Sequence, residues 1–420
     1  MSEQTKHILI IGGGVIGLST AYYCARRGHR VTLIDRNPEQ RDGCSFGNAG
    51  MVVPSHFVPL AAPGVVGTAF KWMFNPESPL YIKPRLNWEL MSCGWKFMRA
   101  ANAQHVARSA PLIRDLSFAS RDCFEELAAL PDNDFGLMKK GLVMLCKTQH
   151  GLDDEAQYAA QANKLGVPAE VMNAQQLATL DPTVTMDVAG GVYFPKDCHL
   201  SPNRFMAGLK QQCDTLGVKF FWETEVTGFT RDASRIAAVH TSHGEFTADE
   251  CVLCGGSWSP VVARDLRLNL PMQAGKGYSL TLPQPRQLPQ LCSIFCEARV
   301  AVTPMGNTLR FGGTMEIAGL NEDINPVRVQ GIIKSVPKYF PDFTPQDFED
   351  IRPWRGLRPC SPDGLPYLGR TARYTNLTIA TGHAMMGLSL GPITGKLMGE
   401  ILSGERPSID VTMLNPDRYA

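Results

Sequence analysis

The feature that most constrains the fold is a glycine pattern set between two apolar runs. Residues 8–11 form an apolar run of strand length, and Gly12, Gly14 and Gly17 precede a second run that ends at Asp35. The first glycine permits a tight turn, the second lets a phosphate approach a helix N-terminus, and the third lets helix and strand pack closely. The acid stands at roughly the 20-residue offset of a carboxylate that binds ribose. The pattern predicts a dinucleotide-binding unit with contacts from Gly12, Gly14, Val15, Ile16, Gly17, Asp35 and Arg36.

Length and composition describe a globular chain without an affinity for nucleic acid. The 420 residues suggest about two to three domains, and 44% hydrophobic with 19% charged residues is typical of a folded protein. A net charge of +1 gives no basic surface of the kind that binds nucleic acid. The first strand begins near residue 8 without a signal peptide, so we expect free thiols at the twelve cysteines. We expect a cytoplasmic protein, with the inner face of the cytoplasmic membrane as the alternative.

One pair of cysteines has the spacing of a metal or redox motif. Cys251 and Cys254 lie three residues apart in an apolar run, and such positions on a strand face opposite sides of a sheet. We therefore expect both thiols to pack in the core, and we expect no metal site.

Two more strand–glycine–helix junctions follow the first, at 255–256 and 382–391. Such junctions lie at the carboxyl ends of strands in a parallel sheet, so all three can converge on one ligand. Between them the pattern predicts helices over 86–130, strands at 141–146 and 190–194, and a helix that starts with Ser201 as N-cap and Pro202 as its first residue. The sequence thus predicts one nucleotide-binding sheet built from distant segments, with a second domain inserted.

The stretch from Val52 to Met98 is rich in Pro, Trp, Phe and Met, including the segment 68–74 and Trp95-Lys-Phe-Met. A long loop with core helices explains this composition. A peripheral membrane face, where aromatic rings and lysines lie at the headgroup level, is the alternative. No stretch has the roughly 18–20 uninterrupted apolar residues of a membrane span.

Four motifs resemble the D-amino acid oxidase superfamily of FAD enzymes, and most closely its bacterial D-amino acid dehydrogenase branch. They are Cys44-Ser-Phe-Gly-Asn-Ala-Gly50, Lys276-Gly-Tyr-Ser, the run 354–364 with Trp354-Arg-Gly-Leu-Arg-Pro, and Thr381-Gly-His with Gly387. The resemblance covers nearly the whole chain. It implies an α/β fold with a Rossmann-like FAD-binding domain (residues 1–84, 197–268 and 354–420). It also implies an inserted antiparallel-sheet substrate domain (residues 85–196 and 269–353).

The resemblance also implies the residues of a site. Arg358 matches the arginine that grips the substrate carboxylate, with Arg355 and Arg352 as nearby alternatives, and Tyr278 matches a tyrosine whose hydroxyl adds a bond to the same carboxylate. A structural arginine in a turn, a core tyrosine with a satisfied hydroxyl and a packing histidine at 383 are the competing interpretations. The further cofactor contacts implied are Ser45, Asn48, Ala49, Gly50, Met51, Val226, Gly255, Gly256, Gly382, His383, Met386, Gly387 and Leu388.

By resemblance, the expected reaction is hydride transfer from the Cα of a D-amino acid to FAD, with electrons passing to a quinone or another acceptor. Met385 and Met386 stand where some relatives have polar groups, which favours a small, apolar or cyclic substrate such as a proline derivative. A glycine or sarcosine-type oxidase that uses oxygen and a flavoprotein subunit of a hetero-oligomer are the alternatives. An NAD dehydrogenase fits the 381–387 motif poorly. The oligomeric state stays open.

Overall fold

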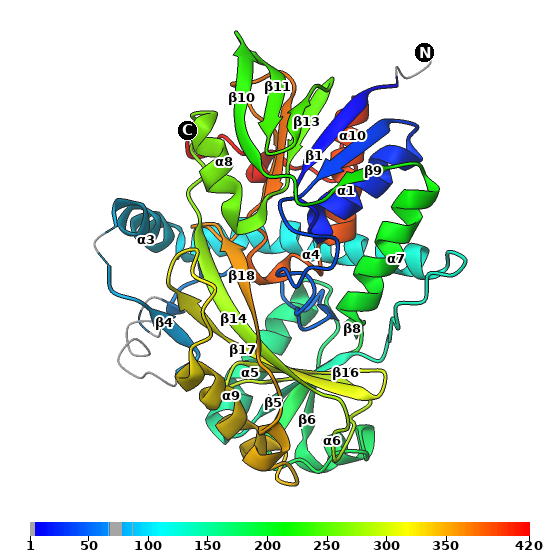
Figure 1. Ribbon diagram of the computed structural model, residues 1–420. Coiled ribbons are helices and arrows are strands. Elements are labelled where there is room, and N and C mark those ends of the chain that lie inside the picture. The colour runs from blue at the N-terminus through cyan, green and yellow to red at the C-terminus, as the bar shows by residue number, and fades with distance from the viewer. Residues whose placement is uncertain (1–4, 66, 68–77, 86) are drawn as a thin grey trace.

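The computed structural model describes residues 5–65, 67, 78–85 and 87–420. Strand β1 lies inside a six-stranded sheet whose order is β19-β20-β13-β1-β2-β9, and only the edge pair β19–β20 is antiparallel. The strands are β1 (His7–Ile11), β2 (Arg30–Ile34), β9 (Lys219–Phe221), β13 (Glu250–Leu253), β19 (Tyr367–Arg370) and β20 (Leu377–Thr381). Distant parts of the chain therefore assemble one mostly parallel sheet (Figure 1).

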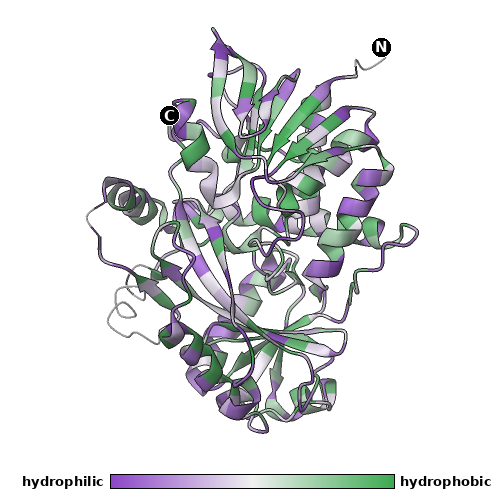
Figure 2. Cartoon of the chain, viewed as in Figure 1, coloured by the Kyte–Doolittle hydropathy of each residue, from purple (hydrophilic) through white to green (hydrophobic). Residues whose placement is uncertain are grey.

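Helices cover one face of this sheet, and a small sheet covers the other. The helices are α1 (Val15–Arg26), α4 (Ala103–Ala128), α7 (Pro202–Thr215) and α10 (Gly391–Ser403), and their apolar residues share one core with β1 and β2. The opposite core is closed by β10 (Val226–Asp232), β11 (Arg235–Thr241), β12 (Gly244–Phe246) and α8 (Ser259–Asp265). Figure 2 shows the apolar residues that run along these central strands.

Cys251 on β13 and Cys254, the residue directly after this strand, pack in different cores. Cys251 packs in the core under the small sheet, and Cys254 packs in the core under the helices. The prediction that the two thiols face opposite sides is therefore confirmed. Both are buried, and burial raises the pKa of each thiol to about 12.

A larger sheet forms the second part of the molecule, in the order β18-β14-β17-β16-β15-β5-β7-β6 with β4 paired to β17. Its strands are β4 (Leu80–Ile82), β5 (Leu142–Cys146), β6 (Glu170–Asn173), β7 (Gly190–Phe194), β14 (Gln273–Leu282), β15 (Cys292–Phe295), β16 (Val300–Met305), β17 (Thr308–Ile317) and β18 (Trp354–Cys360). Most pairs are antiparallel, but β15–β5 and β17–β4 are parallel. Helices α5 (Gln149–Lys164), α6 (Ala174–Leu180) and α9 (Pro326–Tyr339) pack around this sheet (Figure 1).

Two strands, β4 and β18, belong to a different part of the molecule from the one that the sequence predicts. The expected boundaries assigned residues 1–84 and 354–420 to the nucleotide-binding part, whereas β4 and β18 hydrogen bond within the large sheet. The reason is that β18 pairs along its whole length with β14, and no local pattern reveals such a distant partner.

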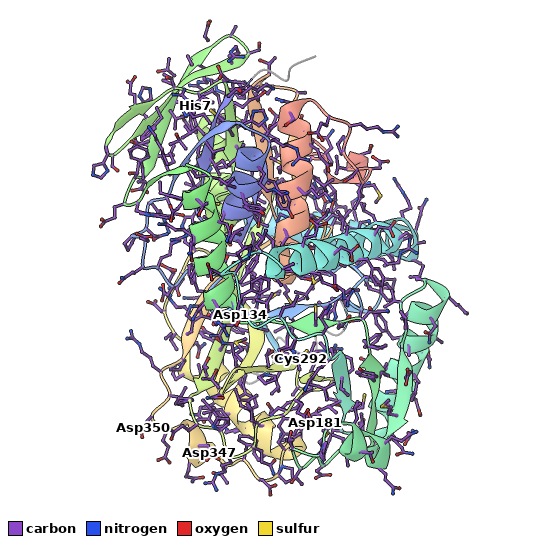
Figure 3. The ribbon with its side chains drawn as sticks, turned by 90° about the vertical axis from the view of Figure 1, so that its right-hand side faces the viewer. His7, Asp134, Asp181, Cys292, Asp347 and Asp350 are labelled. Carbon is purple, nitrogen blue, oxygen red and sulfur yellow. The ribbon has the colours of Figure 1, made fainter. Side chains whose placement is uncertain are left out.

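Other local expectations are confirmed. The helical stretch becomes α3 (Trp88–Ala100) and α4, and the strands at 141–146 and 190–194 appear as β5 and β7. Helix α7 starts at Pro202 after Ser201, although the Ser201 side chain makes no capping hydrogen bond. His7 on β1 lies at the opposite end of the molecule from Asp347, in the short helix Pro345–Phe348, and Asp350 (Figure 3).

The apolar segment 68–74 lies outside the described residues, whereas β4 and α3, which follow it in the same stretch, are described. Among the described helices, none combines the length and the hydropathy needed to cross a bilayer.

Candidate functional site

The three glycine junctions meet at one edge of the nucleotide-binding sheet. A Cβ on Gly12 would lie 2.5 Å from the carbonyl oxygen of Cys254, which precedes the second junction. The Thr381 hydroxyl, just before the third junction, donates to the Gly256 carbonyl at 3.1 Å. A Cβ on Gly17 would lie 1.8 Å from the Gly12 carbonyl, so α1 and β1 approach to a distance that only glycine permits.

At the first junction, Asp35 closes β2 and faces the glycine turn. Its carboxylate accepts hydrogen bonds from the amides of Gly13 at 2.6 Å and Asn37 at 2.8 Å. Gly14 is the N-cap of α1 and provides no side-chain cap, and the next amide, that of Val15, donates to the Ser45 hydroxyl at 3.0 Å. Ile16 follows in the first turn of the helix. The turn thus presents amides and one hydroxyl at the helix N-terminus, where the helix dipole favours an anion.

Two arginines stack on tryptophans beside this junction. Arg36 lies 4.1 Å over the ring of Trp258, which belongs to the second junction. Arg41 lies 4.2 Å over Trp222 and donates to the Gly13 carbonyl. Burial lowers the pKa of Arg41, and Asp35 and Glu39 act against this shift.

The segment 45–51 runs from this junction toward the large sheet. The Asn48 side chain accepts from the Gly50 amide at 2.9 Å, and Ala49 packs against an apolar core. Met51 belongs to β3 (Met51–Val52), which pairs with β8 (Cys198–His199). Gly50 passes so close to Leu200 that a Cβ would lie 2.3 Å from its carbonyl oxygen.

A buried carboxyl holds the chain beyond β3. Asp197 accepts from the Ser55 amide at 3.0 Å and from the Ser55 hydroxyl at 2.5 Å. Burial raises the pKa of Asp197 to about 7, although the two bonds from Ser55 oppose the shift.

The remaining cofactor candidates lie on the second and third junctions and on β10. His383 is buried and exchanges a hydrogen bond with Thr394 at 3.0 Å, and burial lowers its pKa to about 3. Gly382 and Gly387 flank it, Met386 packs between two apolar cores, and Leu388 is buried. Gly255 precedes the short helix Gly256–Trp258, and Val226 is the first residue of β10, paired with Thr241.

Strand β18 brings Arg358 to the same place. The Ser257 hydroxyl donates to the Leu357 carbonyl at 3.0 Å, and Cys360 forms an isolated backbone bridge with His383. The second and third junctions therefore hold the residues on either side of Arg358. This arginine is half-buried, and no described carboxylate lies within ion-pair distance of it.

A local irregularity orients the Arg358 side chain. The β14–β17 pairing shifts register between Lys276 and Tyr278, and Thr314 on the opposite strand has a φ of 60°, which is rare outside glycine. The Thr314 carbonyl accepts from Arg358 Nη1 at 2.7 Å. The guanidinium lies over Gly277, where a Cβ would come within 2.1 Å of it.

The three arginines of this strand region have different surroundings. Arg355 Nη1 pairs with Asp42 at 2.7 Å and its Nη2 with Glu322 at 3.5 Å. Arg352 is exposed. Only Arg358 combines partial burial at the junctions with the absence of an acidic partner among the described residues.

The structure does not bring Tyr278 together with Arg358. Tyr278 lies on the opposite face of β14 from Gly277, in the core under α9, and is 1% exposed. Its hydroxyl donates to Glu316 at 2.8 Å and accepts from the Asn325 amide at 3.2 Å. Burial and the bond to Glu316 raise the pKa of this phenol above its usual value.

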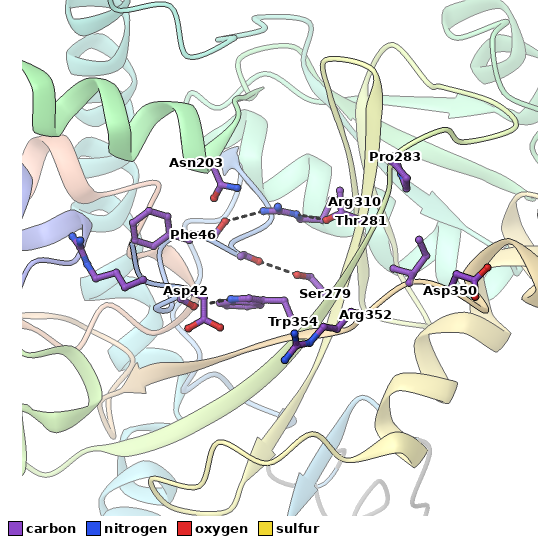
Figure 4. A pocket seen from close by; sticks show the side chains of 13 residues that line it. Asp42, Phe46, Asn203, Ser279, Thr281, Pro283, Arg310, Asp350, Arg352 and Trp354 are labelled. Atoms are coloured by element: carbon purple, nitrogen blue, oxygen red, sulfur yellow. Dashed lines mark hydrogen bonds between the residues drawn. The ribbon is translucent and has the colours of Figure 1, made fainter. Parts of the chain in front are cut away.

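A pocket with a volume of about 410 Å³ opens on the Arg358 face of the large sheet. Its wall on one side is the loop 41–47, and on the other side Ser279, Thr281 and Arg310 of β14 and β17, as Figure 4 shows. The Ser279 hydroxyl donates to the Gly47 carbonyl at 3.2 Å, and Trp354 Nε1 donates to the Asp42 carbonyl at 2.7 Å. The remaining lining residues are Arg41, Phe46, Asn203, Pro283, Asp350, Ile351 and Arg352.

Comparison with known proteins identifies the family. A family model described as FAD dependent oxidoreductase, named DAO, matches residues 7–401. The chain belongs to the DAO family of FAD-dependent oxidoreductases.

Full-length relatives within this family are similar to the chain. It is 34% identical to a D-amino acid dehydrogenase of Bradyrhizobium diazoefficiens, over 98% of this chain and 99% of the relative. It is 33% identical to a D-amino acid dehydrogenase of Granulibacter bethesdensis, with the same coverage of 98% and 99%. The predicted family, its FAD dependence and an oxidoreductase activity are thereby confirmed.

Solved structures share the fold of this DAO family chain. Glycine oxidase from Geobacillus kaustophilus superposes with a TM-score of 0.78 at 24% identity, covering 99% of this chain and 100% of that one. L-proline dehydrogenase from P. horikoshii gives a TM-score of 0.73 at 16% identity, covering 99% and 98%. The predicted fold class, a Rossmann-like FAD-binding domain with an inserted sheet domain, is confirmed.

The residues at the junctions fit the cofactor of the DAO family. The N-terminus of α1 has no side-chain cap from Gly14, and a Cβ on Gly14 would meet only the Ser45 hydroxyl, at 3.6 Å. A Cβ on Gly256 would meet no atom within 4 Å, so there is open space at the second junction. Among the described residues, Nδ1 of the buried His383 has no hydrogen-bond partner. A helix N-terminus with glycine as its N-cap, open space and an unpartnered buried nitrogen are the features that a nucleotide cofactor would use.

Sequence reasoning missed three side chains of this region, Arg41, Trp222 and Arg310. Arg41 lies beyond β2, Trp222 follows β9, and Arg310 belongs to the large sheet. Their arrangement depends on pairings between distant segments. The one signal available in the sequence was the presence of two arginines, Arg36 and Arg41, soon after the acid that follows β2.

Proposed function

We propose that the chain oxidises D-amino acids with bound FAD and passes the electrons to a quinone. The observation that carries this proposal is the position of Arg358, a half-buried cation without an acidic partner among the described residues, held where the three glycine junctions meet. The curated relatives named D-amino acid dehydrogenase support the substrate class and an acceptor other than oxygen.

In this proposal, Arg358 binds the substrate carboxylate. Its planar guanidinium can donate to both carboxylate oxygens at once, while the bond to the Thr314 carbonyl fixes its direction. Bound FAD supplies the chemistry of the reaction, because it accepts the hydride from the substrate Cα. The chain therefore contributes orientation, which holds the Cα–H bond in one direction.

Neither His383 nor Tyr278 acts as a general base toward the substrate Cα in this proposal. The low pKa of His383, about 3, keeps its imidazole neutral, and the Tyr278 hydroxyl is engaged with Glu316 on the other face of the sheet. The proposal requires a neutral substrate amine, whose lone pair assists as the imine forms. The imine then hydrolyses to a 2-oxo acid and ammonia, or stays cyclic when the substrate is cyclic.

We further propose that the protein contacts the membrane where its quinone is dissolved, through helix α3. Trp88, Met91, Trp95 and Met98 form one stripe of this helix, and their side chains are 79%, 58%, 59% and 50% exposed. The opposite side of the helix, with Cys93, packs inward. Trp and Met beside the cations Lys96 and Arg99 fit the interface of an anionic bilayer, in which indole rings lie at the headgroup level.

The test of the catalytic proposal is anaerobic mixing of the purified flavoprotein with a panel of amino acids. We expect D-amino acids, including D-proline, to bleach the flavin absorbance, and their L-enantiomers to do so slowly or not at all. Bleaching by L-amino acids or by glycine derivatives alone would contradict the proposed substrate class.

A further inference from the structure

The pocket of Figure 4 is not explained by amino acid binding. Arg358 lies over Gly277, and Ser279 in the pocket wall is two residues further along β14, or roughly 7 Å at the rise of a strand. Arg358 is not among the lining residues. The pocket is therefore a neighbour of the proposed carboxylate site, on the same face of the sheet.

The pocket touches the segment proposed to run along the cofactor. Phe46 and Gly47 line it, and this part of the chain leads directly into residues 48–51. Arg310 donates from Nη1 to the carbonyls of Phe46 at 3.1 Å and Asn48 at 2.7 Å, so a side chain of the pocket holds the segment in place. A ligand in the pocket would contact this segment directly. The backbone of the segment would then lie between the ligand and the proposed cofactor site.

Arg310 is an unusual group to find in such a wall. It is 8% exposed, and burial lowers its pKa to about 10. Its Nε donates to the Thr281 hydroxyl at 3.0 Å, but among the described residues Nη2 has no acceptor and no carboxylate forms an ion pair with it. A buried cation without a counter-charge favours a ligand that brings a hydrogen-bond acceptor.

The remaining residues that line the pocket indicate which chemical class of ligand it can bind. Phe46, Trp354, Ile351 and Pro283 give apolar and aromatic surface, and a volume of about 410 Å³ lies in the range of small-molecule sites. Asp42 and Asp350 also line the pocket and offset much of the charge of its arginines, so the lining lacks the excess of cations that a multiply charged anion such as phosphate needs. A planar, neutral molecule with carbonyl oxygens at its edge matches both the apolar walls and the arginine donors.

We propose that this pocket binds the head group of the quinone that accepts the electrons, with its carbonyl oxygens toward Arg310 and Arg352. The inference rests on the proposed function, and it assigns a second substrate site to the same sheet face. Over one turnover the amino acid loses two electrons and two protons as it becomes an imine. The quinone gains two electrons and two protons and becomes a hydroquinone, so the exchange balances without another co-reactant.

Two variants at the pocket mouth test the assignment. Asn203→Trp fills the space from the exposed start of α7, and Arg352→Ala removes an exposed cation that forms no ion pair with the residues that the structure describes. Arg406→Ala removes an exposed arginine near the C-terminal end of α10 and is the matched control.

The first measurement is direct binding of a soluble naphthoquinone to the oxidised flavoprotein, by equilibrium dialysis without amino acid. We expect Asn203→Trp to weaken this binding by at least about tenfold and Arg352→Ala by about three- to tenfold, which is the size of one lost polar contact. Arg406→Ala should bind like the wild type. Equal binding by all four proteins would overturn the assignment.

The second measurement separates the two half-reactions. Anaerobic bleaching of the flavin by a D-amino acid should be unchanged in both pocket variants, while return of the flavin absorbance on adding the naphthoquinone should slow in parallel with the weaker binding. If the amino acid dependence of bleaching changes instead, the pocket belongs to the amino acid site and the inference is wrong. If no amino acid bleaches the wild-type flavin, the proposed function itself fails, and the binding measurement still decides the pocket.

Discussion

At the scale of single residues, burial and partners separate three arginines that the sequence presents within seven positions. Arg355 forms ion pairs with Asp42 and Glu322, and Arg352 is exposed at a pocket mouth. Arg358 is fixed by a backbone carbonyl and has no acidic partner among the described residues. An ion-paired arginine binds a substrate carboxylate only if its present partner is displaced, whereas Arg358 can bind one directly.

Arg358→Ala should weaken amino acid binding by roughly 10- to 150-fold, because charge-assisted hydrogen bonds are worth about 1.5–3 kcal/mol. Arg358→Lys keeps the charge but loses the planar fork, so it should recover only part of that loss. The measurement is the concentration dependence of anaerobic flavin bleaching by a D-amino acid, with equal FAD content confirmed in each variant. A fully flavinated Arg358→Ala protein with wild-type saturation would move the carboxylate site elsewhere.

At the scale of elements, helix α3 is unusual because its exposed side is apolar, whereas a helix on the surface of a protein in water normally exposes polar side chains. Its inward side includes the buried Cys93, while the outward side carries two tryptophans and two methionines. Asn87 caps its N-terminus with a hydrogen bond to the Leu90 amide, so the helix is well formed without a partner on the exposed stripe. Large exposed apolar patches are typical of interaction surfaces.

Replacing Trp88 and Trp95 together by serine should reduce binding of the protein to vesicles that contain anionic lipid. Each large apolar side chain that enters the interface contributes about 1.5–3 kcal/mol, so we expect a loss of at least about tenfold in the partition coefficient. The measurement is co-sedimentation with vesicles at low and high salt.

Val171→Ser is the control for this experiment, since Val171 is also 50% exposed but lies on β6 in the large sheet. If wild type and double variant bind vesicles equally while only the wild type dimerises, the stripe is a contact between two copies of the chain.

At the scale of the whole molecule, the cofactor site depends on segments that are far apart in the chain. Residues 12–17, 255–257 and 381–387 contact one another through the Gly12–Cys254 approach and the Thr381–Gly256 hydrogen bond. A ligand that touches all three junctions binds only the folded molecule, so its binding free energy adds to the stability of the whole.

Adding FAD to the apoprotein should therefore raise the melting temperature, and a ligand at 100 times its Kd contributes about 2.7 kcal/mol. Asp35→Ala should lower this gain, because the carboxylate that faces the glycine turn is lost. The measurement is thermal unfolding by circular dichroism with and without FAD, together with identification of the yellow cofactor released on denaturation. Asp134→Ala, an exposed acid far from the junctions, is the control. Release of NAD or FMN, or an undiminished gain in Asp35→Ala, would contradict the expectation.

The sequence predicted those features that depend on local sterics. Gly12 and Gly17 lie where a Cβ would meet backbone atoms, and this requirement is visible in a short motif. It is harder to predict from the sequence which face of a sheet a strand residue points to, because the face alternates from one residue to the next. Tyr278 shares a motif with Lys276, but it pairs with Arg355 across the β14–β18 ladder, whereas Arg358 pairs with Gly275, and the Tyr278 side chain faces the core. Arg310 near the cofactor segment, and β18 in the large sheet, depend on pairings that no local pattern contains.

The central position of β1 has a consequence for synthesis on the ribosome. β1 and β2 are complete by residue 34, yet β13 and β20 on the other side of β1 end at residues 253 and 381. β13 is the strand that pairs with the open edge of β1, and at about 5–20 residues per second translation from the end of β2 to the end of β13 takes roughly 10–45 s. During that interval one edge of a strongly apolar strand has no partner, and the nascent chain depends on protection by chaperones or by the inserted domain. The nucleotide-binding sheet is begun before the large sheet and finished after it.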